Sequence, residues 1–592
     1  MKNKKVLFIN PPGWQKESIN LGIAYLSSAL QSVGYSTLTL DANRYELNDN
    51  ELAGKVLDFS PSVIGVSVKT ATANTGGHIA NFLSSVYPDA HFIVGGPHLT
   101  LCPESYLRDF PVFEYAILGE GEKSIVELAE ALSLHIPVDP INGLAYRKNG
   151  RIVTNPWRPP DDLDNLPIPD FESIEGFDWR DFRYPILSSR GCPFQCTYCC
   201  VNKLTGSRKW RARSAKNVAA ELEYIVRSKG IKAFEVWDDN FTLNIERAKE
   251  ICRELITRKL NLSWYCHNGI RADRIDRELA GLMKQAGCTS IAFGIESGNP
   301  ETFNSIKKGE SLSTVVEAIN IVKAVGIKAV GYYIIGLPGD TLEKFIDTVR
   351  FQRTLRLDHY TYGMLIPYPK TEVWDMVNER GRFFCDITAT QHFSNDIVPI
   401  SFEIPDFPRQ DMVRAFYISK YYDLYAVVQR IIDSGQTPTV VHLSDPDILE
   451  HLPGMIIACD PRARHLISGI TDEQAFFRLP SRSQLPAGIN ITFTRKIPDN
   501  LPSGATVIVC RAKAIPRSLL FRNTGLVFIN PRLPLHLVVL VRNHITTKWH
   551  LPEFFMSLMG YVNGMNHAVK LYGIKNIFKT VRIKIKGFRL IR

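Results

Sequence analysis

The sequence predicts an α/β protein with two successive domains built on parallel strands, followed by a C-terminal mixed α/β region. Short β-rich runs alternate with helical patterns from residue 1 to about 140 and again from about 186 to 400. Of the 592 residues, 45% are hydrophobic and 22% are charged, as in globular rather than disordered or membrane-spanning chains. We therefore expect domains at 1–140 and 186–400, a linker at 141–185 and a C-terminal region at 401–592.

The first series is typical of a flavodoxin-like or Rossmann-like parallel sheet with helices on both faces. The expected strands are residues 6–9, 36–40, 63–67, 91–94 and 115–118, and helices are expected at 21–33, at 78–86 and after residue 122. Ligands of such sheets bind beyond the carboxyl ends of the strands. Glycines follow two of these strands, at Gly95, Gly96, Gly119 and Gly121. We expect these glycines to border a ligand site.

The second series predicts a full or partial β/α barrel. It follows a proline-rich stretch, residues 156–169, that interrupts any regular period. Strands are expected near 185 and at 233–237, 262–265, 290–294 and 329–335, and a helix at 214–228 has Ser214 as its N-cap. In a β/α barrel, the chemistry lies on the loops that follow the strands.

Three cysteines lie directly after the first strand of the second series. Cys192, Cys196 and Cys199 form a CxxxCxxC pattern. A compact loop of this spacing can bring three thiolates to one iron–sulfur cluster and leave one iron open, since such clusters normally have four cysteine ligands. A zinc site or buried free cysteines are the alternative. We interpret the adjacent Cys200 as a small buried residue rather than a ligand.

This loop, together with the segments after the later strands, resembles the radical S-adenosylmethionine (SAM) superfamily. The resemblance implies that Cys192, Cys196 and Cys199 hold a 4Fe–4S cluster whose open iron binds SAM. It also implies SAM-site roles for Tyr198 beside the cluster or adenine, Asp238 and Asp239 at the ammonium, Arg271 at the carboxylate, Glu296 and Ser297 at the ribose or carboxylate, and Gly336 along the adenine. Taken alone, each of these segments is also compatible with an ordinary strand and its turn. Asp238 and Asp239 are also compatible with a helix cap. Lys370 departs from the pattern, because it stands where the superfamily has glycine.

The first domain resembles the cobalamin-binding domain that precedes the barrel in part of this superfamily. The segments at residues 10–12, 95–98 and 119–122 stand in the order shown by that group. The resemblance implies cobalamin bound along Gly95, Gly96, Gly119 and Gly121, where the missing side chains let backbone approach a corrin. The sequence has no DxHxxG motif, so we expect no protein imidazole on cobalt. The alternative is an α/β domain that binds nothing.

Together, the resemblances imply an enzyme that cleaves SAM to methionine and a 5′-deoxyadenosyl radical, with a reductant such as flavodoxin or ferredoxin as partner. We expect cobalamin-dependent methylation of an unactivated carbon in a small-molecule substrate. One alternative is a cobalamin-dependent radical cyclase or rearrangement enzyme without methyl transfer. A second is a non-catalytic metal-binding sensor. The sequence identifies neither the substrate nor a catalytic acid or base.

Charge and hydropathy predict a cytoplasmic protein. The apolar run after the basic N-terminus has four residues, too few for a signal peptide, and no stretch reaches the roughly 18 apolar residues of a membrane span. The net charge is +10, and residues 570–592 carry eight Lys and Arg and no acidic residue. This basic tail could contact an anionic membrane. The alternation at 581–585 favours ordinary packing instead, and nucleic acid is not an expected partner.

Overall fold

The computed structural model describes residues 4–13, 19–160, 162–180, 182–388, 400–416, 418–419 and 422, together with six later strands. The chain divides into two compact units, Met1–Lys420 and Tyr421–Arg592. The first unit contains both predicted α/β domains. The second unit contains the six later strands.

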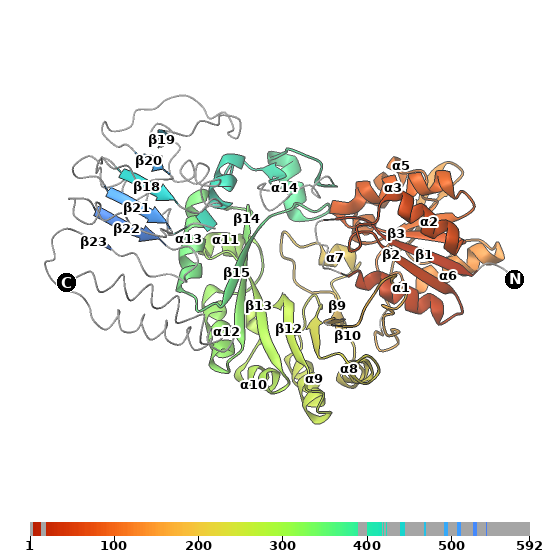
Figure 1. The fold of residues 1–592 in the computed structure, drawn as a ribbon, viewed down its shortest axis with the longest axis horizontal. Coiled ribbons are helices and arrows are strands. Elements are labelled where there is room, and N and C mark those ends of the chain that lie inside the picture. Colours follow the sequence, from red (N-terminus) through yellow and green to blue (C-terminus); the bar gives the residue numbers. More distant parts are fainter. Residues whose placement is uncertain are drawn as a thin grey trace, which may run out of the picture. The chain divides into compact units, whose positions relative to one another are not determined.

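The first domain is a seven-stranded sheet of order β2-β1-β3-β4-β5-β6-β7 (Figure 1). Its parallel strands are β1 (Lys5–Asn10), β2 (Ser36–Asp41), β3 (Val63–Ser67), β4 (His91–Gly95) and β5 (Tyr115–Ile117). Helices α1 (Leu21–Gln31) and α6 (Glu122–Leu134) share one core, whereas α2 (Asp49–Phe59), α3 (Ala73–Val86) and α5 (Pro103–Asp109) share another. Two cores with one sheet between them confirm the predicted doubly wound, flavodoxin-like domain.

The first sheet continues past residue 140, into the segment that we expected to be a linker. Strands β6 (Leu144–Lys148) and β7 (Arg151–Thr154) form a hairpin that pairs antiparallel with β5. Its turn is Asn149–Gly150, and both residues have positive φ, 52° and 74°, as a two-residue hairpin turn requires. Further along, Phe171 packs against Phe177, Trp179, Phe182 and Tyr184. Much of the segment expected to be a linker is therefore packed. The alternating residues of the hairpin and the aromatic rings have apolar surface that is buried against the rest of the unit.

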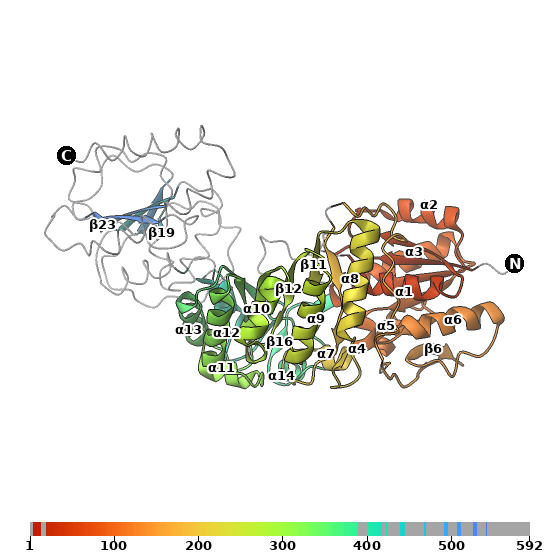
Figure 2. The ribbon, with the colours of Figure 1, turned by 90° about the horizontal axis from the view of Figure 1, so that it is seen from below.

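The second domain is a six-stranded parallel sheet in consecutive order. Its strands are β8 (Tyr184–Ile186), β11 (Ala233–Val236), β12 (Ser263–Ile270), β13 (Cys288–Glu296), β14 (Lys328–Ile335) and β15 (His359–Met364). Helices cover its outer face (Figures 1 and 2): α8 (Ala215–Lys229), α9 (Ile245–Thr257), α10 (Arg277–Gln285), α12 (Leu312–Ala324) and α13 (Leu342–Thr354). Among the described strands, β8 and β15 do not pair with each other. The structure thus confirms a partial β/α barrel.

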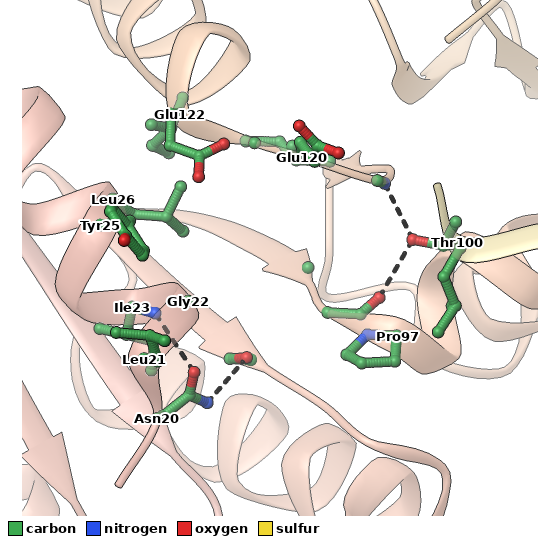
Figure 3. Close-up of a pocket in the computed structure, with 18 of the residues that line it drawn as sticks. Asn20, Leu21, Gly22, Ile23, Tyr25, Leu26, Pro97, Thr100, Glu120 and Glu122 are labelled. Atoms are coloured by element: carbon green, nitrogen blue, oxygen red, sulfur yellow. Dashed lines mark hydrogen bonds between the residues drawn. The ribbon is translucent and has the colours of Figure 1, made fainter. Parts of the chain in front are cut away.

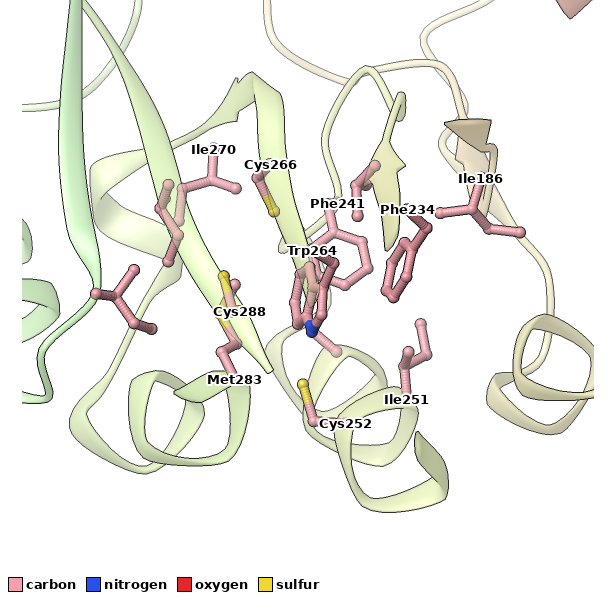
Figure 4. Close-up of a cluster of buried hydrophobic side chains, with 14 of the residues drawn as sticks. Ile186, Phe234, Phe241, Ile251, Cys252, Trp264, Cys266, Ile270, Met283 and Cys288 are labelled. Atoms are coloured by element: carbon pink, nitrogen blue, oxygen red, sulfur yellow. The ribbon is translucent and has the colours of Figure 1, made fainter. Parts of the chain in front are cut away.

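The barrel core is organised around buried aromatic rings between sheet and helices (Figure 4). Phe234 stacks on Trp264 at a centroid distance of 5.3 Å, and Phe241 meets Trp264 edge-on. Three buried cysteines, at 252, 266 and 288, fill gaps in the same cluster. At the start of α8, the Ser214 side chain accepts a hydrogen bond from the Asn217 N–H, as predicted for its N-cap. These contacts fix the strands whose carboxyl ends carry the candidate site.

The second unit contains a six-stranded sheet of order β19-β20-β18-β21-β22-β23. Its strands are β18 (Thr439–Leu443), β19 (Ile467–Ser468), β20 (Ile491–Thr494), β21 (Thr506–Cys510), β22 (Gly525–Ile529) and β23 (Leu540–Val541), and all pairings are parallel except that of β23. In the described part of the chain, no helix has the length and apolar character needed to cross a membrane. Residues 570–592 lie outside the described residues, so membrane contact through the basic tail stays a prediction.

Candidate functional site

The three candidate cluster ligands lie on one loop, which begins directly after β9 (Ser189–Arg190). At its root, Gly191 has φ 87°, and a Cβ there would lie 2.5 Å from the Lys209 carbonyl oxygen, so only glycine fits. At its centre, the Thr197 N–H donates to the Ile306 carbonyl, and the Thr197 carbonyl accepts from the Val373 N–H. The loop is therefore held on both sides by the barrel.

The thiols of this loop are free and suit a metal cluster. Desolvation raises the pKa of Cys196 and raises that of Cys199 to about 12, so a bound cation is needed to stabilise the thiolates. Beside the loop, the buried Thr197 Oγ1 and Asn240 Oδ1 have no hydrogen-bond partner among the described residues. No three His, Cys, Asp or Glu side chains of the described chain are arranged around a single metal ion. A 4Fe–4S cluster, in contrast, distributes its thiolates over different irons.

Tyr198 and Glu296 come together beside the loop, and Lys308 joins them. The Tyr198 hydroxyl donates to Glu296 Oε1 at 2.9 Å, and Lys308 Nζ lies 3.4 Å from the same oxygen while donating to the Gly294 carbonyl. Burial lowers the pKa of Lys308, but Glu296 and Glu310 outweigh it and keep that pKa above its usual value. Sequence analysis missed Lys308, although the Lys307–Lys308–Gly309 run that follows β13 was a usable signal.

Arg271 lies beside the cysteine loop and contacts Lys308. Its guanidinium stacks on the ring of Phe194, inside the cysteine loop, at 3.5 Å from the ring centroid. It also donates to Asp273 Oδ1 at 2.9 Å and to the Lys308 carbonyl at 2.7 Å. Two buried cations, Arg271 and Lys308, therefore adjoin the cysteine loop, and each is paired with acidic side chains.

Asp238 and Ser297 are occupied by contacts within the barrel. The Asp238 carboxylate accepts hydrogen bonds from the Ser188 N–H, the Ser188 hydroxyl and the Ser189 hydroxyl, at 2.5 to 2.6 Å. Ser297 Oγ contacts Thr348 Oγ1 at 2.9 Å and accepts from the Asn299 N–H. The Asp238 oxygens therefore hold the β8–β9 connection, and the ammonium role of Asp238 stays a prediction.

The other two expected SAM-side positions lie elsewhere in the barrel. Asp239 Oδ2 accepts from the Gly191 N–H at 2.8 Å, and Asp239 lines a cavity described below. Gly336 has φ 95° and lies against Phe402 and Met412. Lys370 adopts φ 67°, the left-handed conformation that usually favours glycine. The departure at Lys370 thus keeps a glycine-like backbone.

The geometry of Asp238 leads to a first test. We expect Asp238→Asn to lower the free energy of unfolding by about 1–3 kcal/mol, because the amide nitrogen cannot accept the hydrogen bonds of Ser188 and Ser189. Urea denaturation measures this cost, and Asp239→Asn, which loses fewer contacts, serves as the matched variant. Undiminished stability of Asp238→Asn combined with lost SAM binding would instead support the ammonium role.

A cavity of about 410 Å³ lies at the carboxyl ends of β3, β4 and β5 (Figure 3). All four glycines predicted for the first domain line it: Gly95, Gly96, Gly119 and Gly121. Thr100, which sequence analysis missed, ties their two loops together, since its Oγ1 donates to the Gly96 carbonyl and accepts from the Gly119 N–H. Asn20 caps α1 and donates to Ser67 Oγ at the other side of the cavity.

The barrel closes this cavity from the other side. Its contribution comes from residues that flank the cysteine loop, namely Leu187, Arg190, Leu204, Thr205, Trp237 and Asp239. Among the described lining residues none is histidine. His98 is buried nearby, where it contacts Thr70 Oγ1 at 3.4 Å and packs edge-on against Tyr106. One cavity thus adjoins both the glycine loops and the cysteine loop.

Comparisons with known proteins agree with this geometry. Residues 15–129 match the B12 binding domain and residues 186–351 match the radical SAM superfamily. The chain is 31% identical over 386 residues to the uncharacterized methyltransferase PH0819 of Pyrococcus horikoshii, covering 63% of this chain and 83% of that protein. It is 26% identical over 388 residues to the anaerobic magnesium-protoporphyrin IX monomethyl ester cyclase of Rubrivivax gelatinosus, covering 63% and 67%.

A solved structure shares the fold of the first unit. The radical S-adenosylmethionine methyltransferase TsrM from Kitasatospora setae, with cobalamin and a [4Fe-4S] cluster bound, superposes with a TM-score of 0.58 at 18% identity. The alignment covers 71% of this chain and 95% of that one. At this identity the likeness concerns the fold.

Proposed function

The chain belongs to the radical SAM enzymes that carry an N-terminal B12-binding domain, and from this premise we propose that it is a cobalamin-dependent methyltransferase. The observation that carries the proposal is the shared cavity: glycine loops of the first domain and residues flanking the cysteine loop form its walls. Such a cavity brings a cofactor of the first domain next to the cluster loop. The methyltransferase name of the 31% identical relative supports the same reaction.

Each part of the site has a proposed task. Cys192, Cys196 and Cys199 hold the cluster, and the four glycines of the cavity hold the corrin. When bound, a cluster at these cysteines would supply reducing chemistry toward SAM, and a cobalamin at these glycines would supply methyl-carrier chemistry. The neighbours of the cysteine loop, Tyr198, Glu296, Lys308 and Arg271, orient SAM through their charges and hydrogen bonds.

The apolar wall of the cavity has a separate task. Leu187, Leu204 and Trp237 line its barrel side. Apolar walls exclude water, which protects reactive species from side reactions. The substrate in this proposal is a small molecule with an unactivated carbon, and the electron comes from a reductant such as flavodoxin or ferredoxin.

A radical cyclase is the second candidate function, because the relative of Rubrivivax gelatinosus carries that activity in its name. Its likeness covers 63% of this chain, and a shared fold alone does not separate the two reactions. The products made from SAM separate them. Methyl transfer from SAM leaves S-adenosylhomocysteine, whereas reductive cleavage leaves 5′-deoxyadenosine.

We expect the full chain, reconstituted anaerobically with iron, sulfide and hydroxocobalamin and supplied with SAM and dithionite, to form both products. Liquid chromatography with mass detection measures them. Omitting hydroxocobalamin should remove S-adenosylhomocysteine and leave 5′-deoxyadenosine. Formation of 5′-deoxyadenosine alone under all conditions would favour the cyclase. Formation of neither by iron-replete protein would contradict both proposals.

A further inference from the structure

A buried cluster of four charged residues joins the first domain to the root of the cysteine loop. Arg190 and Arg211 (in β10, Arg211–Ala212) are directly paired across the antiparallel β9–β10 ladder, so their side chains emerge side by side. Arg190 Nη1 and Arg211 Nη1 donate to Glu120 Oε2 at 2.9 and 3.0 Å. Arg190 Nη2 also donates to Glu122 Oε1 at 2.6 Å. We call these four residues the interdomain charge cluster.

The interdomain charge cluster is shielded from solvent. The exposed fractions of its side chains are 9% for Arg190, 1% for Arg211, 10% for Glu120 and 14% for Glu122. Burial raises the pKa of Glu122, but Arg190 outweighs it and holds that pKa below its usual value. Buried charges of this kind depend on their partners, and removal of one leaves the other uncompensated. The four side chains therefore hold one another in place.

The interdomain charge cluster connects the cavity wall to the cysteine loop. The connection spans only a few residues on each side. Glu120 and Glu122 belong to the turn at 119–122, which lines the cavity. Arg190 directly precedes Gly191 and Cys192, and its guanidinium lies 5.3 Å from the ring centroid of Tyr25, another lining residue. The same side chains thus contact both the turn that would touch an occupant and the start of the cysteine loop.

We propose that the interdomain charge cluster positions the cysteine loop in response to the occupant of the cavity. The inference rests on the proposed function, because it takes cobalamin as that occupant. An occupant that orders the turn at 119–122 also orders Arg190 and Arg211, and Arg190 transmits the constraint along the backbone to Cys192. The four residues are positioning residues, since they act on the loop and not on the reacting atoms.

Hydrogen exchange of the full chain tests the inference, with hydroxocobalamin as the probe. In the unmodified chain, we expect hydroxocobalamin to slow amide exchange in peptides covering residues 190–205 by about tenfold or more. Glu120→Gln keeps the shape and removes the charge, so it should lose this protection while β12 and β13 exchange normally. The matched control is Glu127→Gln on α6, whose partner Lys123 lies 3.5 Å away at the surface; it should behave like the unmodified chain.

A double-mutant cycle adds a readout that general destabilisation would not produce. Arg190→Gln leaves Glu122 without its hydrogen-bonded cation, and Glu122→Gln leaves Arg190 with Glu120 as its remaining carboxylate partner. The double variant should therefore lose no more protection than the worse single variant. Additive losses, or full protection in Glu120→Gln, would overturn the inference.

The same experiment separates this inference from the proposed function. If the unmodified chain binds no hydroxocobalamin, the proposed function fails. The charge cluster is then judged on the cofactor-free chain, where Glu120→Gln should still speed exchange in residues 190–205. Unchanged exchange there would reject the charge cluster as a positioning element.

Discussion

Replacing Cys192, Cys196 or Cys199 by alanine is expected to abolish the iron–sulfur cluster, whereas Cys200→Ala is expected to keep it. Cys192, Cys196 and Cys199 form the CxxxCxxC pattern, and Cys200 is an additional thiol directly after it. Cys200 also precedes α7 (Val201–Leu204), and its carbonyl accepts the Lys203 N–H at 2.9 Å. Its backbone therefore serves the helix start, and we expect its thiol not to be a cluster ligand.

Iron and sulfide analysis of anaerobically reconstituted protein measures this effect. We expect about four irons per chain for the unmodified protein and for Cys200→Ala, because a 4Fe–4S cluster is the expected centre. Each of the other three variants should retain little iron and form no 5′-deoxyadenosine. Since all four variants remove one thiol from the same loop, Cys200→Ala is the matched control. Loss of the cluster in Cys200→Ala but not in Cys192→Ala would reject the ligand assignment.

Local sequence patterns predicted the fold better than they predicted the direction of side chains. The spacing of the three cysteines fixes a single loop, so its place after a strand could be read directly. Asp238 and Asp239 were both expected at the SAM ammonium, yet neighbouring residues after a strand point to opposite sides. Asp238 turns to Ser188 and Ser189, whereas Asp239 lines the cavity. Only the packing of β8 against β11 decides which of the two aspartates faces the serines and which faces the cavity.

Residues that act across long sequence distances were missed. Thr100 joins two glycine loops, Gly96 and Gly119, that lie 23 residues apart in the chain. Lys308 reaches the cysteine loop only because the segment that follows β13 packs against that loop in the folded barrel. The hairpin of β6 and β7 is different, because its Asn149–Gly150 turn is a local signal. There the proline-rich stretch that follows led us to place a linker too early.

Gly96→Ala is expected to weaken cobalamin uptake, with the largest effect of any single substitution in the first domain that we consider. Gly96 has φ 104° and ψ 178°, a conformation that is essentially restricted to glycine. A Cβ there would lie 2.6 Å from the Val68 carbonyl oxygen, which is main chain and cannot rotate away. That carbonyl also accepts the His98 N–H, so any relief moves the start of α4 (Pro97–Leu101) as well.

The disturbance should spread to both glycine loops, because the Gly96 carbonyl accepts from Thr100 Oγ1, which in turn holds the Gly119 N–H. We expect Gly96→Ala to cost about 2–4 kcal/mol of unfolding free energy and to weaken hydroxocobalamin binding by at least about tenfold. Optical titration and urea denaturation of the full chain measure the two effects. Gly54→Ala on α2 is the control, since a Cβ there would meet nothing within 4 Å and Gly54 does not line the cavity. Equal stability and equal binding of the two variants would show that the backbone of Gly96 does not shape the cavity.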